Sequence, residues 1–236
     1  MKGTRIVDLT YPIYDRMSNV WPGLPETEVR YCRIKEKEHC NELVFTMTTH
    51  SGTHIDAPSH IGLPTTLDDI PFEKLYGDGV VLDVQRGELG RITPEDLEKA
   101  RPEVRENDMV LLYTGWGKLW GKRTDQEHLW KRPGILWDTA DWLVKKKVKL
   151  VGIDGLAIQC PIPHPTEPQK YTGPSATEFD PKYSVHDRLL GNNIVILEGL
   201  TNLDIIVGKR LKIGVFPLPI RAADGAPVRA VAFLEE

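Results

Sequence analysis

The chain has 236 residues, of which 40% are hydrophobic and 27% are charged, and its formal net charge is −4 at pH 7. This length suits one domain with a substantial buried core, and we expect a single domain over residues 1–236. The mixed charge forms no basic footprint, which argues against a nucleic-acid partner. No apolar run approaches the roughly 18 residues that span a bilayer, so no membrane partner is expected.

The cysteines and the first residues indicate a compartment. The opening Met-Lys-Gly-Thr-Arg-Ile-Val-Asp-Leu lacks the apolar core of a signal peptide. Cys32, Cys40 and Cys160 are odd in number and form no CxxC pair, so a disulfide framework is not expected. A reducing cytoplasm is therefore the location that we expect.

The sequence predicts a series of short strands. Ile6–Thr10 and Glu28–Ile34 alternate as half-buried strands do, and Leu43–Thr49 is rich in β-branched and apolar residues. Gly79–Val84 and Met109–Tyr113 are continuous apolar runs, which are typical of buried strands. Further strands are expected at residues 150–154, 193–198, 212–216 and 228–233, with Asp224-Gly225 as the turn between the last two.

Three segments carry helix signals. Thr93 is expected as an N-cap with Pro94 in the first helical position, while Ser184 begins a short helix that Gly191 closes. Between them, residues 138–147 have acids first and lysines last, as the helix dipole prefers. Turn-rich residues 20–25 and proline-rich residues 159–183 are expected as loops. The order of elements predicts an α/β domain whose mixed β-sheet forms a β-barrel-like core flanked by helices.

The segment His50-Ser-Gly-Thr-His54-Ile-Asp56-Ala-Pro-Ser-His60 holds three of the seven histidines and an aspartate. Imidazole and carboxylate together are the usual ligands of zinc or manganese. In an extended chain all four side chains would share one face, but a glycine and a proline make an unbroken strand improbable. We therefore expect a strand that runs into a turn, gathering the four groups into a metal site.

Two later residues are candidates to extend this site. His186 lies on the short capped helix, and Glu198 ends an otherwise apolar strand. A carboxylate at the end of a buried strand is costly unless it is paired, hydrogen-bonded or metal-bound. The alternative for Glu198 is a solvated strand end, and spacing alone does not bring either residue to the first cluster.

The histidine segment resembles the signature H-x-G-T-H-x-D-x-P-x-H of the cyclase family, which includes bacterial kynurenine formamidases and isatin hydrolases. Every fixed position of the signature is present. The resemblance extends to Trp21-Pro-Gly23, to Gly79–Asp83, to Val151–Asp154 and to the tail Asp224-Gly-Ala-Pro-Val-Arg229. It implies an α/β fold with a barrel-like core and an assembly of two or four identical chains, a homodimer or a homotetramer.

The same resemblance implies roles for individual residues. His50, His54 and Asp56 would bind one metal ion, and Asp56 would bridge to a second ion held by His186 and Glu198. His60 would be the catalytic base. The implied cofactor is Zn²⁺, as one or two ions, with Mn²⁺ as the alternative.

The implied function is metal-dependent hydrolysis of a small aryl or cyclic amide, as in the conversion of N-formylkynurenine to kynurenine and formate. Three alternatives stay open: an isatin hydrolase, a lactone-acting or cyclase enzyme, and a metal-dependent binding protein without turnover. Asp154-Gly-Leu-Ala157 departs from the family's Asp-Thr-x-Ser, which leaves the substrate open. Trp21, Trp116 and Trp120 are candidates for an aromatic wall around the substrate, with ordinary packing as the alternative for each.

Overall fold

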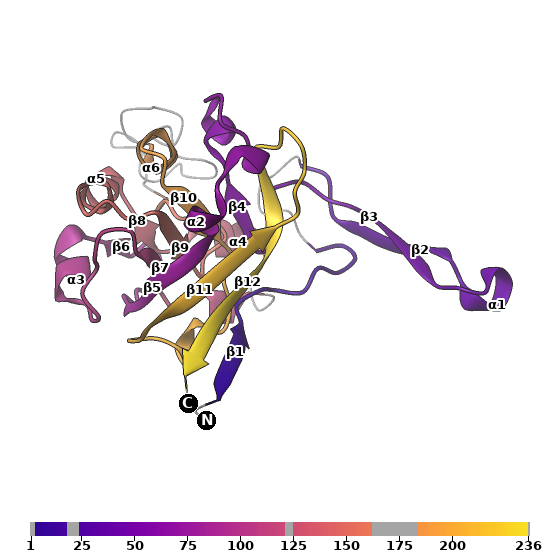
Figure 1. Ribbon diagram of the computed structural model, residues 1–236, viewed down its shortest axis with the longest axis horizontal. Helices are drawn as coiled ribbons and strands as arrows, with labels where there is room; N and C mark the ends of the chain where they lie inside the picture. The colour runs from indigo at the N-terminus through magenta and orange to yellow at the C-terminus, as the bar shows by residue number, and fades with distance from the viewer. Residues whose placement is uncertain (1–2, 18–23, 121–124, 162–183, 236) are drawn as a thin grey trace.

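A computed structural model describes residues 3–17, 24–120, 125–161 and 184–235. Its centre is an 8-stranded mixed sheet in the order β1-β12-β11-β5-β7-β9-β10-β4, in which β12 also pairs with β4. That extra pairing closes all of these strands except β1 into a barrel, with helices on one side (Figure 1). The predicted α/β fold with a barrel-like mixed sheet is confirmed.

The barrel sheet is formed by β1 (Thr4–Asp8), β4 (His54–Asp56), β5 (Tyr76–Asp83), β7 (Met109–Tyr113), β9 (Leu150–Ile153), β10 (Val195–Glu198), β11 (Arg210–Pro217) and β12 (Gly225–Glu235). Two smaller sheets pair β2 (Glu28–Arg33) with β3 (Glu42–Thr46) and β6 (Arg91–Ile92) with β8 (Gly134–Ile135). The α-helices are α1 (Lys35–Glu38), α2 (Phe72–Leu75), α3 (Pro94–Lys99), α4 (Asp125–Trp130), α5 (Trp137–Lys145) and α6 (Val185–Gly191). Short 3₁₀ helices are η1 (Pro58–Ile61), η2 (Leu67–Asp69), η3 (Trp116–Leu119) and η5 (Leu203–Ile205).

The central strands are buried on both faces. Leu111 belongs to the apolar cluster that also contains Ile55 and Leu197, whereas its neighbour Val110 belongs to a second cluster with Leu143 of α5. Since successive side chains of a strand point to opposite faces, both faces of β7 need apolar residues. This explains the continuous apolar runs in the sequence, which are typical of parallel strands covered by helices. None of the described helices is both long and apolar enough to cross a membrane.

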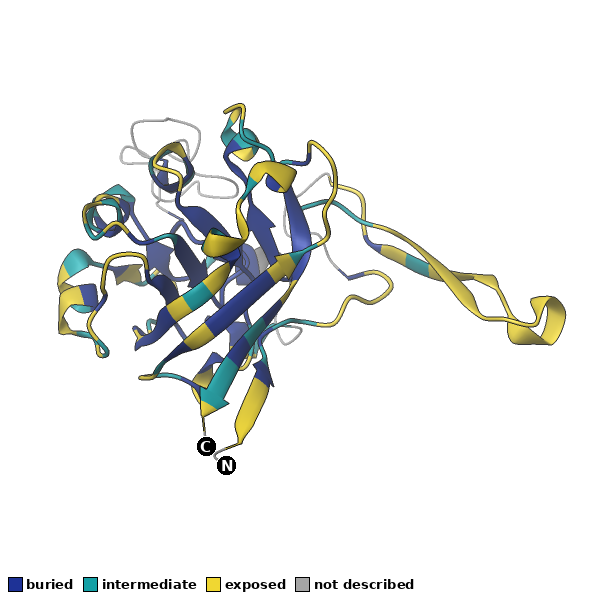
Figure 2. Ribbon diagram, viewed as in Figure 1, coloured by how far each residue is buried: buried dark blue, intermediate teal, exposed yellow. Residues whose placement is uncertain are grey.

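The ribbon of β2 and β3 corrects one prediction. The first of these segments was expected to be half-buried, but it pairs with the second in a separate two-stranded sheet that projects from the barrel and is largely exposed (Figures 1 and 2). The alternation of residues predicted β2 correctly, but it does not specify what covers the apolar face of that strand. The second strand ends at Thr46, short of the expected Thr49, before a turn that leads to the histidine segment.

The helix caps agree with the sequence, except at one end. Thr93 and Ser184 each accept a hydrogen bond from a backbone N–H in the first turn, as N-caps do. Gly191, however, is the last residue of α6, and Asn192 is the C-cap. The expected segment 20–25 lies mostly, and 159–183 almost wholly, outside the described residues.

The turn predicted at Asp224-Gly225 is also wrong. β11 ends at Pro217, residues 218–224 form the connection, and Gly225 is already the first residue of β12. Gly225 pairs with Asp56 of β4, so its backbone belongs to the seam that closes the barrel. A Cβ at Gly225 would lie 2.5 Å from the carbonyl oxygen of Ile55 and 2.8 Å from Cε1 of His50, so this close approach needs glycine.

Candidate metal centre

The pairing of β4 with β10 places three of the candidate residues on one face. Glu198 lies directly opposite His54 in the antiparallel register, and Asp56 follows two residues after His54. Ile55 and Leu197 point into the barrel's apolar cluster, so the three polar side chains point to the other face. All three are buried. The strand end at Glu198 is therefore not solvated.

His186 and His60 reach this face from two short helices that contact each other. His186 is the second residue of α6, and His60 lies in η1, just after β4. The start of α6 is fixed by Ser184 and by the side-chain oxygen of Gln159, which accepts a hydrogen bond from the backbone N–H of Val185 at 2.8 Å.

The ligand atoms of these residues converge. Asp56 Oδ1 lies 2.8 Å from His50 Nδ1 and 3.6 Å from His54 Nε2, while Asp56 Oδ2 lies 3.5 Å from His186 Nε2. The Glu198 carboxylate lies 3.5 Å from His54 Nε2 and 3.6 Å from His186 Nε2. One aspartate thus faces two groups of ligand atoms, His50 with His54 on one side and His186 on the other.

Hydrogen bonds to the backbone fix the orientation of the ligand side chains. His54 Nδ1 lies 3.0 Å from the carbonyl oxygen of Gly52, which turns Nε2 toward the carboxylates. The backbone N–H of Ile158 donates to Glu198 Oε1 at 2.7 Å. A ligating histidine commonly donates its second ring nitrogen to a carbonyl or carboxylate in this manner.

The donor set fits a divalent cation. Asp56 and Glu198 are almost completely buried, and in the described part of the chain histidines are their ion-pair partners. Two adjacent buried carboxylates are costly without a compensating positive charge. Imidazole and carboxylate donors in this combination suit zinc or manganese. Groups of ligand atoms close enough to hold an ion include His50 with His54 and Asp56, and Asp56 with His60 and His186.

The electrostatics of the side chains show the same need for positive charge. Burial by itself lowers the pKa of His50, but hydrogen bonds and the charges of Asp56 and Asp224 raise that pKa from 6.5 to about 9. Burial opposes ionisation of Glu198, yet His186 and His54 hold the pKa of that carboxyl well below its usual value. The protein therefore keeps a proton on His50 in the place where a cation would supply charge.

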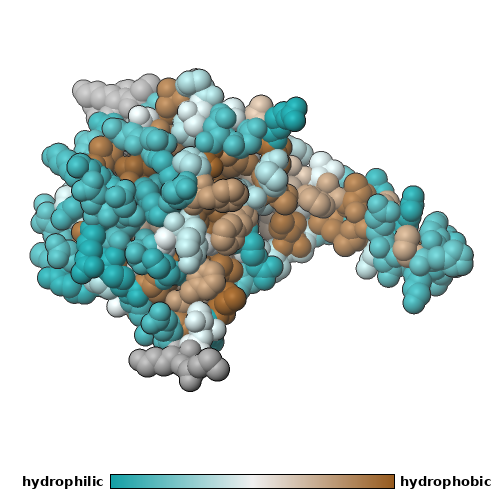
Figure 3. All heavy atoms as spheres, in the orientation of Figure 1, coloured by the Kyte–Doolittle hydropathy of each residue, from teal (hydrophilic) through white to brown (hydrophobic). Residues whose placement is uncertain are grey.

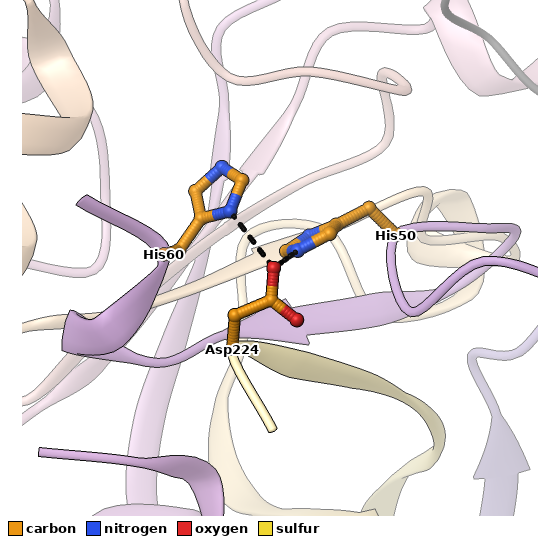
Figure 4. A group of neighbouring side chains, drawn as sticks. All are labelled: His50, His60 and Asp224. Carbon is orange, nitrogen blue, oxygen red and sulfur yellow. Dashed lines mark hydrogen bonds and ion pairs between the residues drawn. The ribbon is translucent and has the colours of Figure 1, made fainter. Parts of the chain in front are cut away.

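Asp224 is a site residue that the sequence analysis missed. Its Oδ2 lies 2.9 Å from His50 Nε2 and 3.5 Å from His60 Nδ1, between the two rings (Figure 4). The only signal in the sequence was its place in the tail that resembles the family, where we interpreted it as a turn residue. The local pattern could not show that β12 pairs with β4 and carries Asp224 to the cluster.

Of the three tryptophans that were candidates for an aromatic wall, the structure describes two. Trp21 lies outside the described residues. Trp116 is buried and donates its indole N–H to the carbonyl oxygen of His128 at 2.8 Å, so it packs in the interior. Trp120 stacks on Tyr11 with ring centroids 4.3 Å apart.

Metal affinity should rise with pH between about 7 and 9, because an ion must displace the proton that the pKa of about 9 keeps on His50. For one proton released, the apparent zinc affinity increases by about tenfold per pH unit and levels off above the pKa. Competition with a chromophoric chelator across this range measures the slope. An affinity that does not change with pH would contradict the assignment of His50 as a ligand.

Comparisons with known proteins identify the family of this chain. The Cyclase family model matches residues 7–159. A kynurenine formamidase from Bacillus anthracis is 29% identical over 236 residues, covering 98% of both chains. A solved structure described as a potential metal-dependent hydrolase with cyclase activity has a TM-score of 0.73 at 27% identity, covering 99% of this chain and 100% of that chain.

Isatin hydrolase A from Labrenzia aggregata, solved with benzyl benzoate bound, has a TM-score of 0.80 and 24% identity, covering 99% of this chain and 94% of that chain. At this identity the likeness shows a shared fold. The family model, in contrast, spans most of the chain, including the whole histidine segment. This chain belongs to the Cyclase family.

Proposed function

We propose that this protein is a metal-dependent hydrolase of a small aryl amide, with N-formylkynurenine as the first substrate to test. The observation that carries the proposal is a partly exposed histidine, His60, next to the buried ligand set. His60 lies beside the buried ligand set, yet its side chain is 34% exposed, compared with 3% for His54. A protein that only bound a ligand through a metal would need the buried set but no accessible base next to it.

His50, His54 and Asp56 would hold one ion, and Asp56, His186 and Glu198 a second. We propose zinc, with manganese as the alternative. A divalent cation held there supplies Lewis acidity, which polarises a carbonyl group and lowers the pKa of water toward about 7.

His60 acts as the general base and then as the general acid. Burial, together with the charges of His50 and His186, lowers the pKa of His60 against the opposing pull of Asp56 and Asp224, so its ring is neutral at pH 7 and can accept a proton. With Nδ1 facing Asp224, Nε2 is the nitrogen free to take a proton from water. The resulting hydroxide forms a C–O bond to the formyl carbon of the amide. As the C–N bond breaks, the same nitrogen returns the proton to the leaving amine, giving the free aryl amine and formic acid, which ionises to formate.

His186→Ala and Glu198→Gln should each lower the metal content from two ions toward one while leaving the fold intact. His186 faces Asp56 Oδ2, whereas His50 faces Oδ1, and Glu198 pairs with His186, so neither variant removes His50, His54 or Asp56. Elemental analysis of the purified variants, with circular dichroism as the control for folding, measures the change. Unchanged metal content in both variants would argue against two ions.

One panel of substrates distinguishes the proposed function from three others. N-formylkynurenine, isatin, other aryl formamides and simple lactones are assayed with zinc and then with manganese. Turnover of isatin alone would assign an isatin hydrolase, for which the shared fold is the present support. Turnover of lactones without any amide would refute the amidase proposal. Tight metal-dependent binding of all candidates without turnover would assign a binding protein.

We also propose that identical chains assemble through the ribbon of β2 and β3. Val29 lies opposite Phe45 and Tyr31 opposite Leu43, so one face of the ribbon is apolar. Phe45, Tyr31 and Leu43 are more than half exposed, and hydrophobic residues gather along the ribbon before its polar tip (Figure 3). A lone two-stranded ribbon is marginally stable in water, so this face needs a cover.

Light scattering should give the mass of a homodimer or homotetramer for the wild type. Leu43→Asp, on the apolar face, should lower that mass toward one chain, whereas Val44→Asp on the opposite face serves as the matched control. A wild-type mass of one chain would contradict the assembly.

We also propose that the protein is cytoplasmic. Cys32, Cys40 and Cys160 form no disulfide. Reduced thiols fit the cytoplasm, because that compartment is reducing.

A further inference from the structure

We propose that Asp224 is a positioning residue whose single carboxylate orients both the base His60 and the metal ligand His50. The inference rests on the proposed function and adds to it a residue that couples the base to the ligand set. Figure 4 shows the carboxylate between the two rings, which come from separate segments of the chain.

The position of Asp224 relative to His60 is fixed by the backbone. The carbonyl oxygen of Asp224 accepts a hydrogen bond from the N–H of Ala57 at 2.8 Å. One residue earlier, the carbonyl oxygen of Ala223 accepts from the Ser59 hydroxyl at 3.2 Å. Ala57 is the N-cap of η1, the helix that carries His60. The aspartate and the histidine are therefore held in one local framework.

The two oxygens of the carboxylate have different partners. Oδ1 accepts a hydrogen bond from the Thr49 hydroxyl at 3.0 Å, which sets the rotation of the group. Oδ2 then faces His50 Nε2 at 2.9 Å and His60 Nδ1 at 3.5 Å. Because His50 Nδ1 faces Asp56, its Nε2 is the outer nitrogen, and a carboxylate on that nitrogen orients the ring and raises its basicity as a ligand.

For His60, the same oxygen favours the tautomer with the proton on Nδ1. That leaves the lone pair of Nε2 free to accept a proton, as in the aspartate–histidine pairs of hydrolases. Without Asp224 the ring is free to rotate and to change tautomer. One carboxylate facing both rings would thus align the base with the ion held by His50.

The test begins with Asp224→Asn, which keeps the size of the side chain and removes its charge. At saturating zinc, kcat for the best substrate should fall by roughly 10²-fold, within the range that general-base catalysis contributes. Zinc affinity should fall by about tenfold to a hundredfold, as for loss of a carboxylate behind a ligating histidine. Thr49→Val should lower kcat by about tenfold at most, since it removes one neutral hydrogen bond.

A double-mutant cycle separates positioning from a general structural role. In the His60→Ala background, Asp224→Asn should change kcat by less than about threefold at saturating zinc, because residues that act as a unit are not additive. A full additional loss in that background would overturn the role through His60. The exposed Asp78→Asn variant, outside the site, is the control for loss of an aspartate.

The ring nitrogens give a readout that needs no substrate. In ¹⁵N spectra of the zinc-loaded protein, His60, assigned from the spectrum of His60→Gln, should be protonated on Nδ1, and Asp224→Asn should shift it toward a mixture of tautomers. A proton on Nε2 in the wild type, or no response to Asp224→Asn, would overturn the proposal. If the tautomer is as expected but no amide is hydrolysed, the proposed function fails and the positioning role stands.

Discussion

Asp56→Asn is expected to remove metal binding and to lower kcat/KM by at least about 10³-fold, which corresponds to the several kcal/mol that a metal ion contributes to catalysis. Asp56 faces both groups of ligand atoms, with Oδ1 toward His50 and His54 and Oδ2 toward His186. An amide in its place cannot supply negative charge to two cations. Elemental analysis and steady-state kinetics measure the two effects.

The variant also removes a buried charge beside three histidines, so folding needs its own control. Asp78 is exposed and forms an ion pair with Lys212 at 2.8 Å, outside the cluster, and Asp78→Asn should retain metal and activity. A well-folded Asp56→Asn protein that kept both metal and turnover would show that the cluster is not the catalytic centre.

His60→Ala should separate catalysis from metal binding. It removes the partly exposed ring but leaves His50, His54 and Asp56 in place, so metal content should stay at the wild-type value. We expect kcat to fall by roughly 10²–10⁴-fold, the usual contribution of a positioned general base. The loss should appear mainly in kcat, because the base acts in the transition state and adds little to binding of the amide.

Kinetics at saturating metal, with elemental analysis of the same sample, distinguish this result from a lost ligand. If His60→Ala lost the metal and regained activity with excess zinc, His60 would be a ligand. His60 does lie close enough to Asp56 and His186 to share an ion with them, so this outcome has a structural basis.

The sequence contained the part of the site that is local. His50, His54, Asp56 and His60 fall within eleven residues, and a short strand followed by a turn is enough to gather them. The buried strands could also be predicted from the sequence, because burial on both faces requires an apolar residue at every position. Local patterns of this kind depend only on neighbours along the chain.

The remaining features depend on contacts between distant segments. Glu198 joins the cluster because β10 pairs with β4, and Asp224 joins because β12 pairs with the opposite edge of β4. No periodicity within one strand specifies which strand will be its neighbour. For the same reason β2, the first strand of the ribbon, was expected to be half-buried, since alternation indicates an apolar face but not what covers it.

Measuring the activity of the unmodified protein with and without metal tests whether the histidine cluster acts through a bound ion. A chelator is used to strip the protein, elemental analysis verifies that no divalent metal remains, and hydrolysis of N-formylkynurenine is followed before and after zinc, manganese or cobalt is added. We predict no detectable hydrolysis by the metal-free protein and recovery on addition of metal. Full activity of the metal-free protein would contradict the proposal that the histidine cluster acts through a bound ion.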